Sequence, residues 1–239
     1  MKTFLTTIKT FIFIIAISSI QLDCVANTGN LHIASQLKQP FMTGLDVLLE
    51  NDCLYLKGKK VGLITNQTGV TSKMVQNIDA FTKSENVDLK AIFSPEHGLF
   101  GSASAGEKIY NKTDSIYGIP LFSLYGNNKK PSQDMLKNLD ILVFDIQDIG
   151  IRSYTYISTM GLAMEAAQER GLEFMVLDRP NPLGLKKIEG NILSLSFKSF
   201  IGRYPIPYVH GLTSGELAKM INEQGLSLIH ISEPTRQKP

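Results

Sequence analysis

The stretch Ile141-Leu142-Val143-Phe144-Asp145-Ile146-Gln147-Asp148-Ile149-Gly150 decides how the rest of the sequence is interpreted. It begins with four apolar residues and a carboxylate, which is typical of a parallel strand that is buried on both faces. Polar residues and a glycine follow at once, as they do where a strand of an α/β sheet ends in a loop. With four similar runs, this stretch predicts strands over residues 61–66, 89–94, 120–125, 141–145 and 174–178.

Amphipathic segments lie between these runs, with apolar residues at spacings of three and four. They predict helices over residues 44–50, 75–83, 133–138, 157–170 and 214–223. Strands that alternate with helices favour an α/β fold with a mostly parallel sheet. The sequence therefore predicts one α/β domain over residues 44–225, preceded by a polar segment over residues 27–43.

The two ends of the chain have a different character. Residues 1–26 carry lysines and then an apolar run over 11–17, which predicts an export signal and a periplasmic or extracellular protein. Cys24 offers lipid attachment as an alternative to cleavage after Ala26, and the membrane is expected as a partner only in that case. Residues 226–239 resemble a translated sequencing adapter, so we expect a non-native tail after about Gly225.

The composition of the 239 residues excludes several classes of protein. The chain is 43% hydrophobic, 19% charged and has a formal net charge of +2, without a basic run of the kind that binds nucleic acid. Residues 67–70 follow the first strand and form neither a dinucleotide fingerprint nor a phosphate loop. Histidine or paired-cysteine spacing for a metal is missing as well. We therefore expect no cofactor and no nucleic-acid partner.

Polar residues gather directly after the predicted strands, where ligands bind in open parallel sheets. The candidate catalytic residues are Glu96, His97, Asp145 and Asp148. The candidate substrate-binding residues are Asn66, Gln67, Gln147, Arg152, Tyr154, Asp178, Arg179, Asn181 and His210. Each has a simpler interpretation in turn formation or loop pairing. The combination of Glu96 and His97 between Pro95 and Gly98 is harder to explain by turns alone.

Five ordered motifs resemble one family, the exo-β-N-acetylmuramidases. They are 66–70 (NQTGV), 94–98 (SPEHG), 144–156 (FDIQDIGIRSYTY), 177–182 (LDRPNP) and 210–213 (HGLT). The resemblance implies a Rossmann-like parallel sheet flanked by helices, followed in the family by a smaller C-terminal domain that we expect to be missing here. It also implies the release of terminal N-acetylmuramic acid from the non-reducing end of peptidoglycan fragments, muropeptides or disaccharides, with Glu96 as the catalytic glutamate.

Glycoside hydrolysis needs a proton donor and a second group that meets the positive charge developing on the sugar. We assign the first role to Glu96, while Asp145, Asp148 and the acetamido group of the substrate remain alternatives for the second. Arg152 and Arg179 are candidates for the lactyl carboxylate of the substrate, because a guanidinium fork matches that anion. Two other hypotheses stay open: a sugar-acid binding module without turnover, and a metal-dependent hydrolase.

Overall fold

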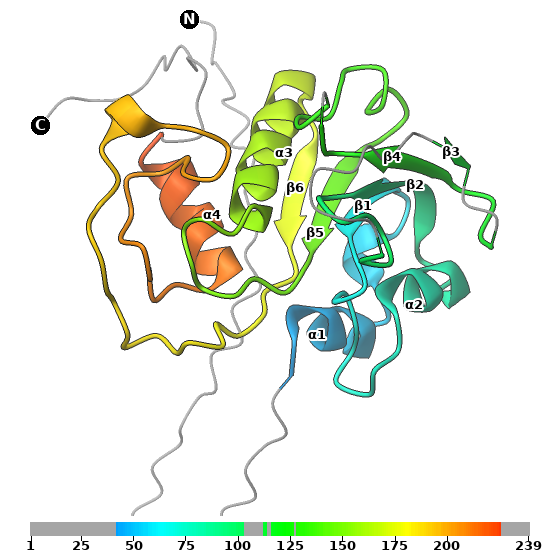
Figure 1. The fold of residues 1–239 in the computed structure, drawn as a ribbon. Coiled ribbons are helices and arrows are strands. Elements are labelled where there is room, and N and C mark those ends of the chain that lie inside the picture. Colours follow the sequence, from blue (N-terminus) through cyan, green and yellow to red (C-terminus); the bar gives the residue numbers. More distant parts are fainter. Residues whose placement is uncertain (1–41, 103–111, 114–115, 127, 226–239) are drawn as a thin grey trace, which may run out of the picture.

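The computed structural model describes residues 42–102, 112–113, 116–126 and 128–225 (Figure 1). The expected signal, most of the polar segment and the expected tail lie outside these residues. A six-stranded sheet forms the centre, in the order β3-β4-β2-β1-β5-β6. Its strands are β1 (Lys60–Thr65), β2 (Asp88–Ser94), β3 (Lys112–Thr113), β4 (Pro120–Ser123), β5 (Ile141–Asp145) and β6 (Glu173–Val176).

Five of the strands run parallel, which confirms the predicted fold class. β1 pairs with β2 on one side and β5 on the other, β2 pairs with β4, and β5 pairs with β6. The short strand β3, which the sequence did not predict, pairs antiparallel with β4. Because β1 and β5 are neighbours although β2 follows β1 in the chain, the direction of winding reverses between them. Ligands bind at such a switch point in open α/β sheets.

Helices cover both faces of the sheet (Figure 1). On one face, α1 (Gly44–Glu50), the 3-10 helix η1 (Leu54–Leu56) and α2 (Asn77–Lys83) pack against the strands. On the other face lie α3 (Tyr156–Arg170) and α4 (Ser214–Glu223). All residues of β5 are buried, as expected for a strand covered on both sides.

The predicted helix over residues 133–138 is wrong. These residues form successive turns, in which Lys137 N donates to Asp134 O and Leu139 N to Leu136 O. Leu136 and Leu139 are nevertheless buried in the core. Apolar spacing therefore identified the buried face correctly, but six residues after Pro131 form too few i to i−4 bonds for a cooperative helix. The other predicted elements differ from the observed ones only at their ends.

A long segment with little regular structure connects β6 to α4 and contains the 3-10 helix η2 (Leu195–Phe197). Isolated bridges pair Val209 with Ile151 and Glu189. Tyr204 is fully buried against Gly161 of α3, where a Cβ would overlap its hydroxyl. These contacts hold the segment against the same side of the domain as α3 and α4. Among the described helices, none is long and apolar enough to cross a membrane.

Candidate active site

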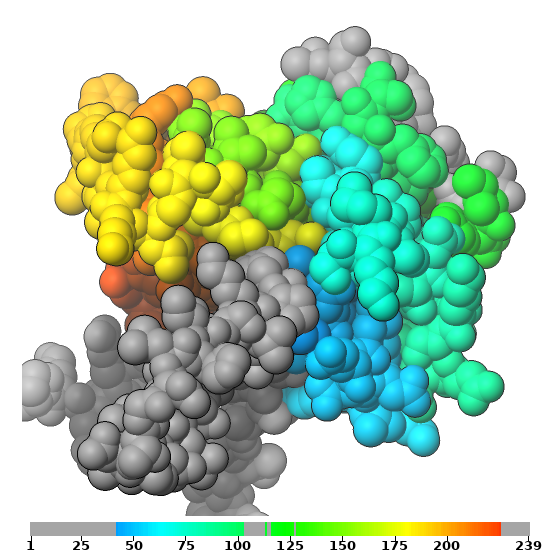
Figure 2. All heavy atoms as spheres, turned by 90° about the horizontal axis from the view of Figure 1, so that it is seen from below, coloured from blue at the N-terminus to red at the C-terminus, as the bar shows by residue number. Residues whose placement is uncertain are grey.

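The carboxyl ends of the parallel strands bring the candidate residues to one edge of the sheet. Figure 2 views the molecule from this edge, where the segment after β6 lies beside α1. The two are joined by a hydrogen bond from Gly44 N to Asp178 O at 2.8 Å. The segment after β6 is thus held to the start of α1.

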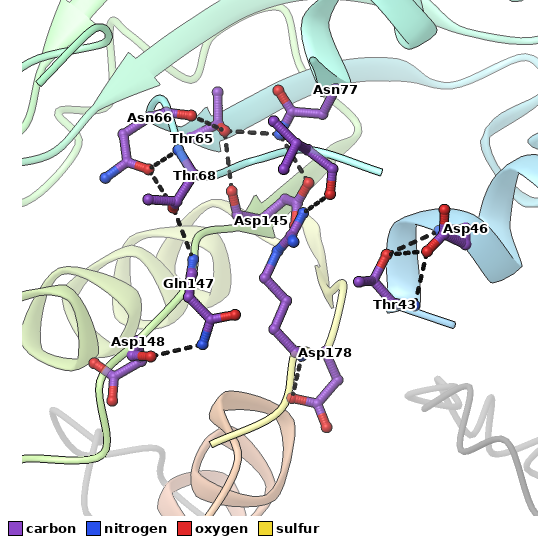
Figure 3. Close-up of polar contacts among 12 residues, drawn as sticks. Thr43, Asp46, Thr65, Asn66, Thr68, Asn77, Asp145, Gln147, Asp148 and Asp178 are labelled. Atoms are coloured by element: carbon purple, nitrogen blue, oxygen red, sulfur yellow. Dashed lines mark hydrogen bonds and ion pairs between the residues drawn. The ribbon is translucent and has the colours of Figure 1, made fainter. Parts of the chain in front are cut away.

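Asn66 organises the loop after β1. Its Oδ1 accepts hydrogen bonds from Thr68 N at 2.9 Å and Thr68 Oγ1 at 2.6 Å, which is the pattern of an Asx turn. Thr68 Oγ1 in turn accepts from Gln147 N at 3.0 Å, so the loops after β1 and β5 are linked (Figure 3). Asn66 is buried. Because β1 and β5 flank the switch point, the link between their loops places Asn66 there.

Glu96 lies in a tight turn after β2. Gly98 N donates to Pro95 O at 3.1 Å, and His97 occupies the third position of that turn with a φ of 69°. A left-handed φ at a residue other than glycine is uncommon and costs free energy, and such residues cluster at functional sites. Glu96 is half-buried, so its carboxyl group is partly shielded from water while a ligand still has access to it.

A hydroxyl group from the start of α3 contacts the Glu96 carboxylate. Thr155 Oγ1 donates to Glu96 Oε2 at 3.0 Å. Burial raises the pKa of Tyr156, with further contributions from Tyr154 and the Glu96 carboxylate, while the Asn66 amide opposes the rise. The Tyr154 and Tyr156 rings meet edge to face at 4.6 Å. The structure thus brings Asn66, Glu96 and Tyr154 together.

Asn66 Nδ2 and Gln67 complete this side of the site. Asn66 Nδ2 is close enough to favour the ionised form of Tyr156, although it makes no hydrogen bond of good geometry. Gln67 is exposed, and its amide lies against Gly101 in the loop after β2, where a Cβ would collide with it. Gln67 therefore lies between the loop after β1 and the loop that carries Glu96.

Asp145 has a different environment from Glu96. It is fully buried, and its Oδ1 accepts from Arg179 Nε at 2.7 Å while its Oδ2 accepts from Asn77 Nδ2 at 2.8 Å (Figure 3). Burial raises the pKa of Asp145, and the Arg179 guanidinium and the Asn77 amide counteract this effect. Both carboxylate oxygens are bonded inside the protein, which favours a structural role over the predicted catalytic one.

Asp148 and His210 form a second acidic and basic pair. Asp148 Oδ2 accepts from Gly150 N at 2.7 Å and lies 3.8 Å from His210 Nε2. His210 Nδ1 accepts from Leu212 N at 3.2 Å, which places the proton of the neutral ring on Nε2. Asp148 Oδ1 and His210 Nε2 are buried without a hydrogen-bond partner in the part of the chain that the structure describes.

The two predicted anion-binding arginines have internal partners. Arg152 Nη1 donates to Asn191 O at 2.7 Å and Ile206 O at 2.6 Å, and the residue is 8% exposed. Arg179 Nη2 donates to Val70 O at 2.9 Å in addition to its bond with Asp145. Since both side chains are buried and bonded to the protein, the geometry favours loop bracing over an exposed fork for a carboxylate.

The remaining candidates also bond within the protein. Asp178 Oδ1 accepts from Gly215 N at 2.7 Å and Oδ2 from Thr213 Oγ1 at 2.7 Å, so this carboxylate stabilises the start of α4. Asn181 Nδ2 donates to Leu212 O at 3.0 Å, and Gln147 Nε2 donates to Pro180 O at 2.8 Å. These three side chains join the loops after β5 and β6 to α4.

Thr155 was not among the candidates predicted from the sequence. Among the described residues, however, its hydroxyl is the group that donates to the Glu96 carboxylate. The signal was available in its position between Tyr154 and Tyr156 at the start of a predicted helix. A metal-binding group of three or more His, Cys, Asp or Glu residues is not found within the described ranges.

The chain is similar to several known proteins. The family model described as exo-beta-N-acetylmuramidase NamZ, N-terminal, matches residues 61–237. The chain is 51% identical over 187 residues to the peptidoglycan beta-N-acetylmuramidase NamZ of Bacillus subtilis (strain 168), a match that covers 78% of this chain and 45% of that protein. It therefore spans about half the length of this curated relative.

Two crystal structures of DUF1343 family proteins from Bacteroides fragilis NCTC 9343 have the same fold. One superposes with a TM-score of 0.73 at 51% identity, over 77% of this chain and 46% of the other. The second has a TM-score of 0.65 at 38% identity, over 77% and 47% of the two chains. By the match to its family model, the chain belongs to the exo-β-N-acetylmuramidase NamZ family, in the N-terminal region of that family.

Proposed function

We propose that this chain is the part of an exo-β-N-acetylmuramidase that carries the catalytic glutamate. The enzyme would release terminal N-acetylmuramic acid from the non-reducing end of peptidoglycan fragments such as muropeptides or disaccharides. Membership of the family and the name of the Bacillus relative support the reaction class. The observation that carries the assignment is the half-buried Glu96 carboxylate beside the Thr155 hydroxyl, at the carboxyl edge of the sheet.

Glu96 fits the role of general acid and base on chemical grounds. Cleavage of a glycosidic bond requires a carboxyl group that gives a proton to the leaving oxygen and then activates water. Among the candidate carboxylates, Glu96 is half-buried and has one described hydrogen-bond donor. Asp145 is fully buried, with both oxygens bonded to protein. The environment of Glu96 is therefore better suited to contact with a substrate.

The second catalytic group is proposed to be Asp148 or the acetamido group of the substrate. Asp148 retains one oxygen, Oδ1, without a partner among the described residues, whereas Asp145 does not. His210 Nε2 lies 3.8 Å from Asp148 Oδ2, so the imidazole is a neighbour of this carboxylate. Export is part of the same proposal, because the predicted signal over residues 1–26 would bring the enzyme to extracytoplasmic peptidoglycan.

Two isomeric disaccharides test the function. One carries N-acetylmuramic acid at the non-reducing end, joined β-1,4 to N-acetylglucosamine, and the other has the sugars reversed. The complete protein encoded by the gene is incubated with each, and free sugars are measured by mass spectrometry. We expect free N-acetylmuramic acid from the first disaccharide and none from the second. Binding of the first by calorimetry without release of product would contradict the proposal and favour a binding module.

A further inference from the structure

Thr155 stands at the N-cap of α3 but does not cap the helix. Its backbone has helical angles, φ −73° and ψ −13°, and its side chain makes no capping hydrogen bond. The N-caps of α1 and α4 are also threonines, Thr43 and Thr213, and both have extended backbones and complete capping boxes. Thr43 and Thr213 thus cap their helices with their side chains, as N-cap threonines usually do. The Thr155 hydroxyl makes no such bond and is available for another partner.

That partner is Glu96, which lies 59 positions earlier in the chain and accepts the Thr155 hydroxyl at 3.0 Å. The two residues belong to elements of different kinds. Thr155 O accepts hydrogen bonds from Thr159 N at 3.0 Å and Thr159 Oγ1 at 3.3 Å, so its backbone is fixed at the start of a 15-residue helix. Glu96 lies in a turn whose next residue has a left-handed φ. The helix therefore supplies the fixed point and the turn supplies the carboxylate.

The hydrogen bond from Thr155 leaves the two oxygens of the Glu96 carboxylate in different environments. Thr155 bonds to Oε2, and the structure gives no hydrogen bond to Oε1 from the residues it describes. A carboxyl group that is held at one oxygen keeps its orientation while the other oxygen reaches a ligand. Catalysis depends on such placement, since a reacting group must lie within hydrogen-bond reach of the atom that it protonates.

We propose that Thr155 is a positioning residue for Glu96: its hydroxyl holds Oε2 so that Oε1 is directed toward the glycosidic oxygen of the substrate. This inference rests on the proposed function of Glu96. Thr155 itself would contact neither the substrate nor the reacting atoms.

Three variants at this position provide the test. Thr155→Val removes the hydroxyl and keeps the shape, Thr155→Ser keeps the hydroxyl, and Thr155→Ala is a second deletion in case valine disturbs the fold. The chain is labelled with carbon-13 at glutamate side-chain carboxyls, and Glu96→Gln identifies the Glu96 signal by its loss. The chemical shift of this carboxyl carbon then reports on its hydrogen bond directly, whether or not the chain turns over substrate.

We expect the Glu96 carboxyl signal to shift in Thr155→Val and Thr155→Ala, because the carboxylate loses the Thr155 hydroxyl that donates to Oε2. Thr155→Ser should restore the original signal. In the disaccharide assay with the complete protein, kcat should fall about tenfold in the valine variant, with KM nearly unchanged.

Identical Glu96 carboxyl signals in the unmodified chain and both deletion variants would overturn the inference, as would a serine variant that behaves like valine. The failure of the proposed function is recognised separately. If Glu96→Gln hydrolyses the disaccharide at the rate of the unmodified protein, Glu96 is not catalytic, whatever Thr155 does to its NMR signal. If Glu96→Gln abolishes hydrolysis while Thr155→Val leaves both kcat and the Glu96 signal unchanged, only the role of Thr155 is refuted.

Discussion

Asp145 shows why a carboxylate at the end of a strand is a weak predictor of catalysis. The sequence places it at the last position of a buried strand, at the carboxyl edge of the sheet, and the structure agrees. Its partners, however, come from two distant parts of the chain: Asn77 on α2 and Arg179 after β6. Such long-range pairing is not visible in local sequence patterns. The same limit applies to Arg152, whose partners are carbonyl groups of Asn191 and Ile206.

Replacement of Asp145 by asparagine should therefore affect stability first. The change leaves the buried Arg179 guanidinium without its counter-charge, and breaking one side of a buried ion pair costs about 3 kcal/mol or more. We expect the free energy of unfolding in urea to fall by about that amount. Asp134→Asn, at an exposed position in the turns before β5, is the control and should change stability little. Equal stability of the two variants would contradict the structural role of Asp145.

The position of Glu96 after the second strand could be predicted from the sequence, but the side chains that contact it could not. Formation of the turn from Pro95 to Gly98 does not require a glutamate, so the presence of Glu96 there predicted a function. The Thr155 hydroxyl that meets Glu96 belongs to the start of α3, 59 residues later. Only the folded sheet, with β2 and β5 on either side of β1, brings these two segments together.

At the scale of elements, helices and strands with strong periodicity were predicted well. The buried runs of β1, β2 and β5 were identified because strands covered on both faces need continuous apolar sequence. Residues 133–138 were wrongly predicted to be helical. The spacing of apolar residues indicates which side chains are buried, and buried turns can have the same spacing as helices. β3 was missed because two residues on a sheet edge carry no periodic pattern.

The first turn of α1 depends on the ionised Asp46 carboxylate. Asp46 is partly buried, which raises its pKa, but hydrogen bonds from Thr43 and Ser72 outweigh this and hold the pKa below the ordinary value of 3.8. A group whose folded pKa is depressed stabilises the fold above its unfolded pKa and loses that contribution as pH falls through the folded value. Stability from Asp46 should therefore be complete above about pH 5 and be lost progressively as the pH falls below about 4.

Asp46→Asn tests this dependence. We expect the variant to be less stable than the unmodified chain by about 1 kcal/mol at about pH 6, as for the loss of a helix cap. The difference should shrink at about pH 2.5, where the protonated aspartic acid also lacks charge. Urea unfolding at the two pH values measures both quantities. A stability difference that stays constant or grows toward acid would show that the charge of Asp46 has no part in the cap.

At the scale of the whole molecule, the segment between β6 and α4 exposes several large apolar side chains. Ile188, Ile192, Phe197 and Ile201 are each more than 60% exposed. The segment is nevertheless anchored to the domain by Arg152 and by an ion pair between Arg203 and Glu165 at 2.5 Å. Exposed apolar side chains on an anchored segment favour association with another apolar surface.

We expect the isolated chain to self-associate through this surface as its concentration rises. The double variant Ile192→Ser and Phe197→Ser should reduce the concentration dependence of the hydrodynamic radius without loss of stability, since both side chains are exposed. Leu54→Ser is a matched control, because Leu54 is 59% exposed but belongs to η1. If the control and the double variant reduce self-association equally, this segment has no special part in it.

Glu96 is proposed to carry the chemistry, and the kinetics of Glu96→Gln show whether it does. Glutamine preserves the size of the side chain but can neither donate the proton to the glycosidic oxygen nor accept one from water. Hydrolysis of the disaccharide with non-reducing N-acetylmuramic acid is measured on the complete protein and on the variant, with unfolding temperatures as the check on folding. We expect kcat/KM to fall about a thousandfold with the unfolding temperature unchanged. A folded variant that retains a near-normal rate would contradict the claim.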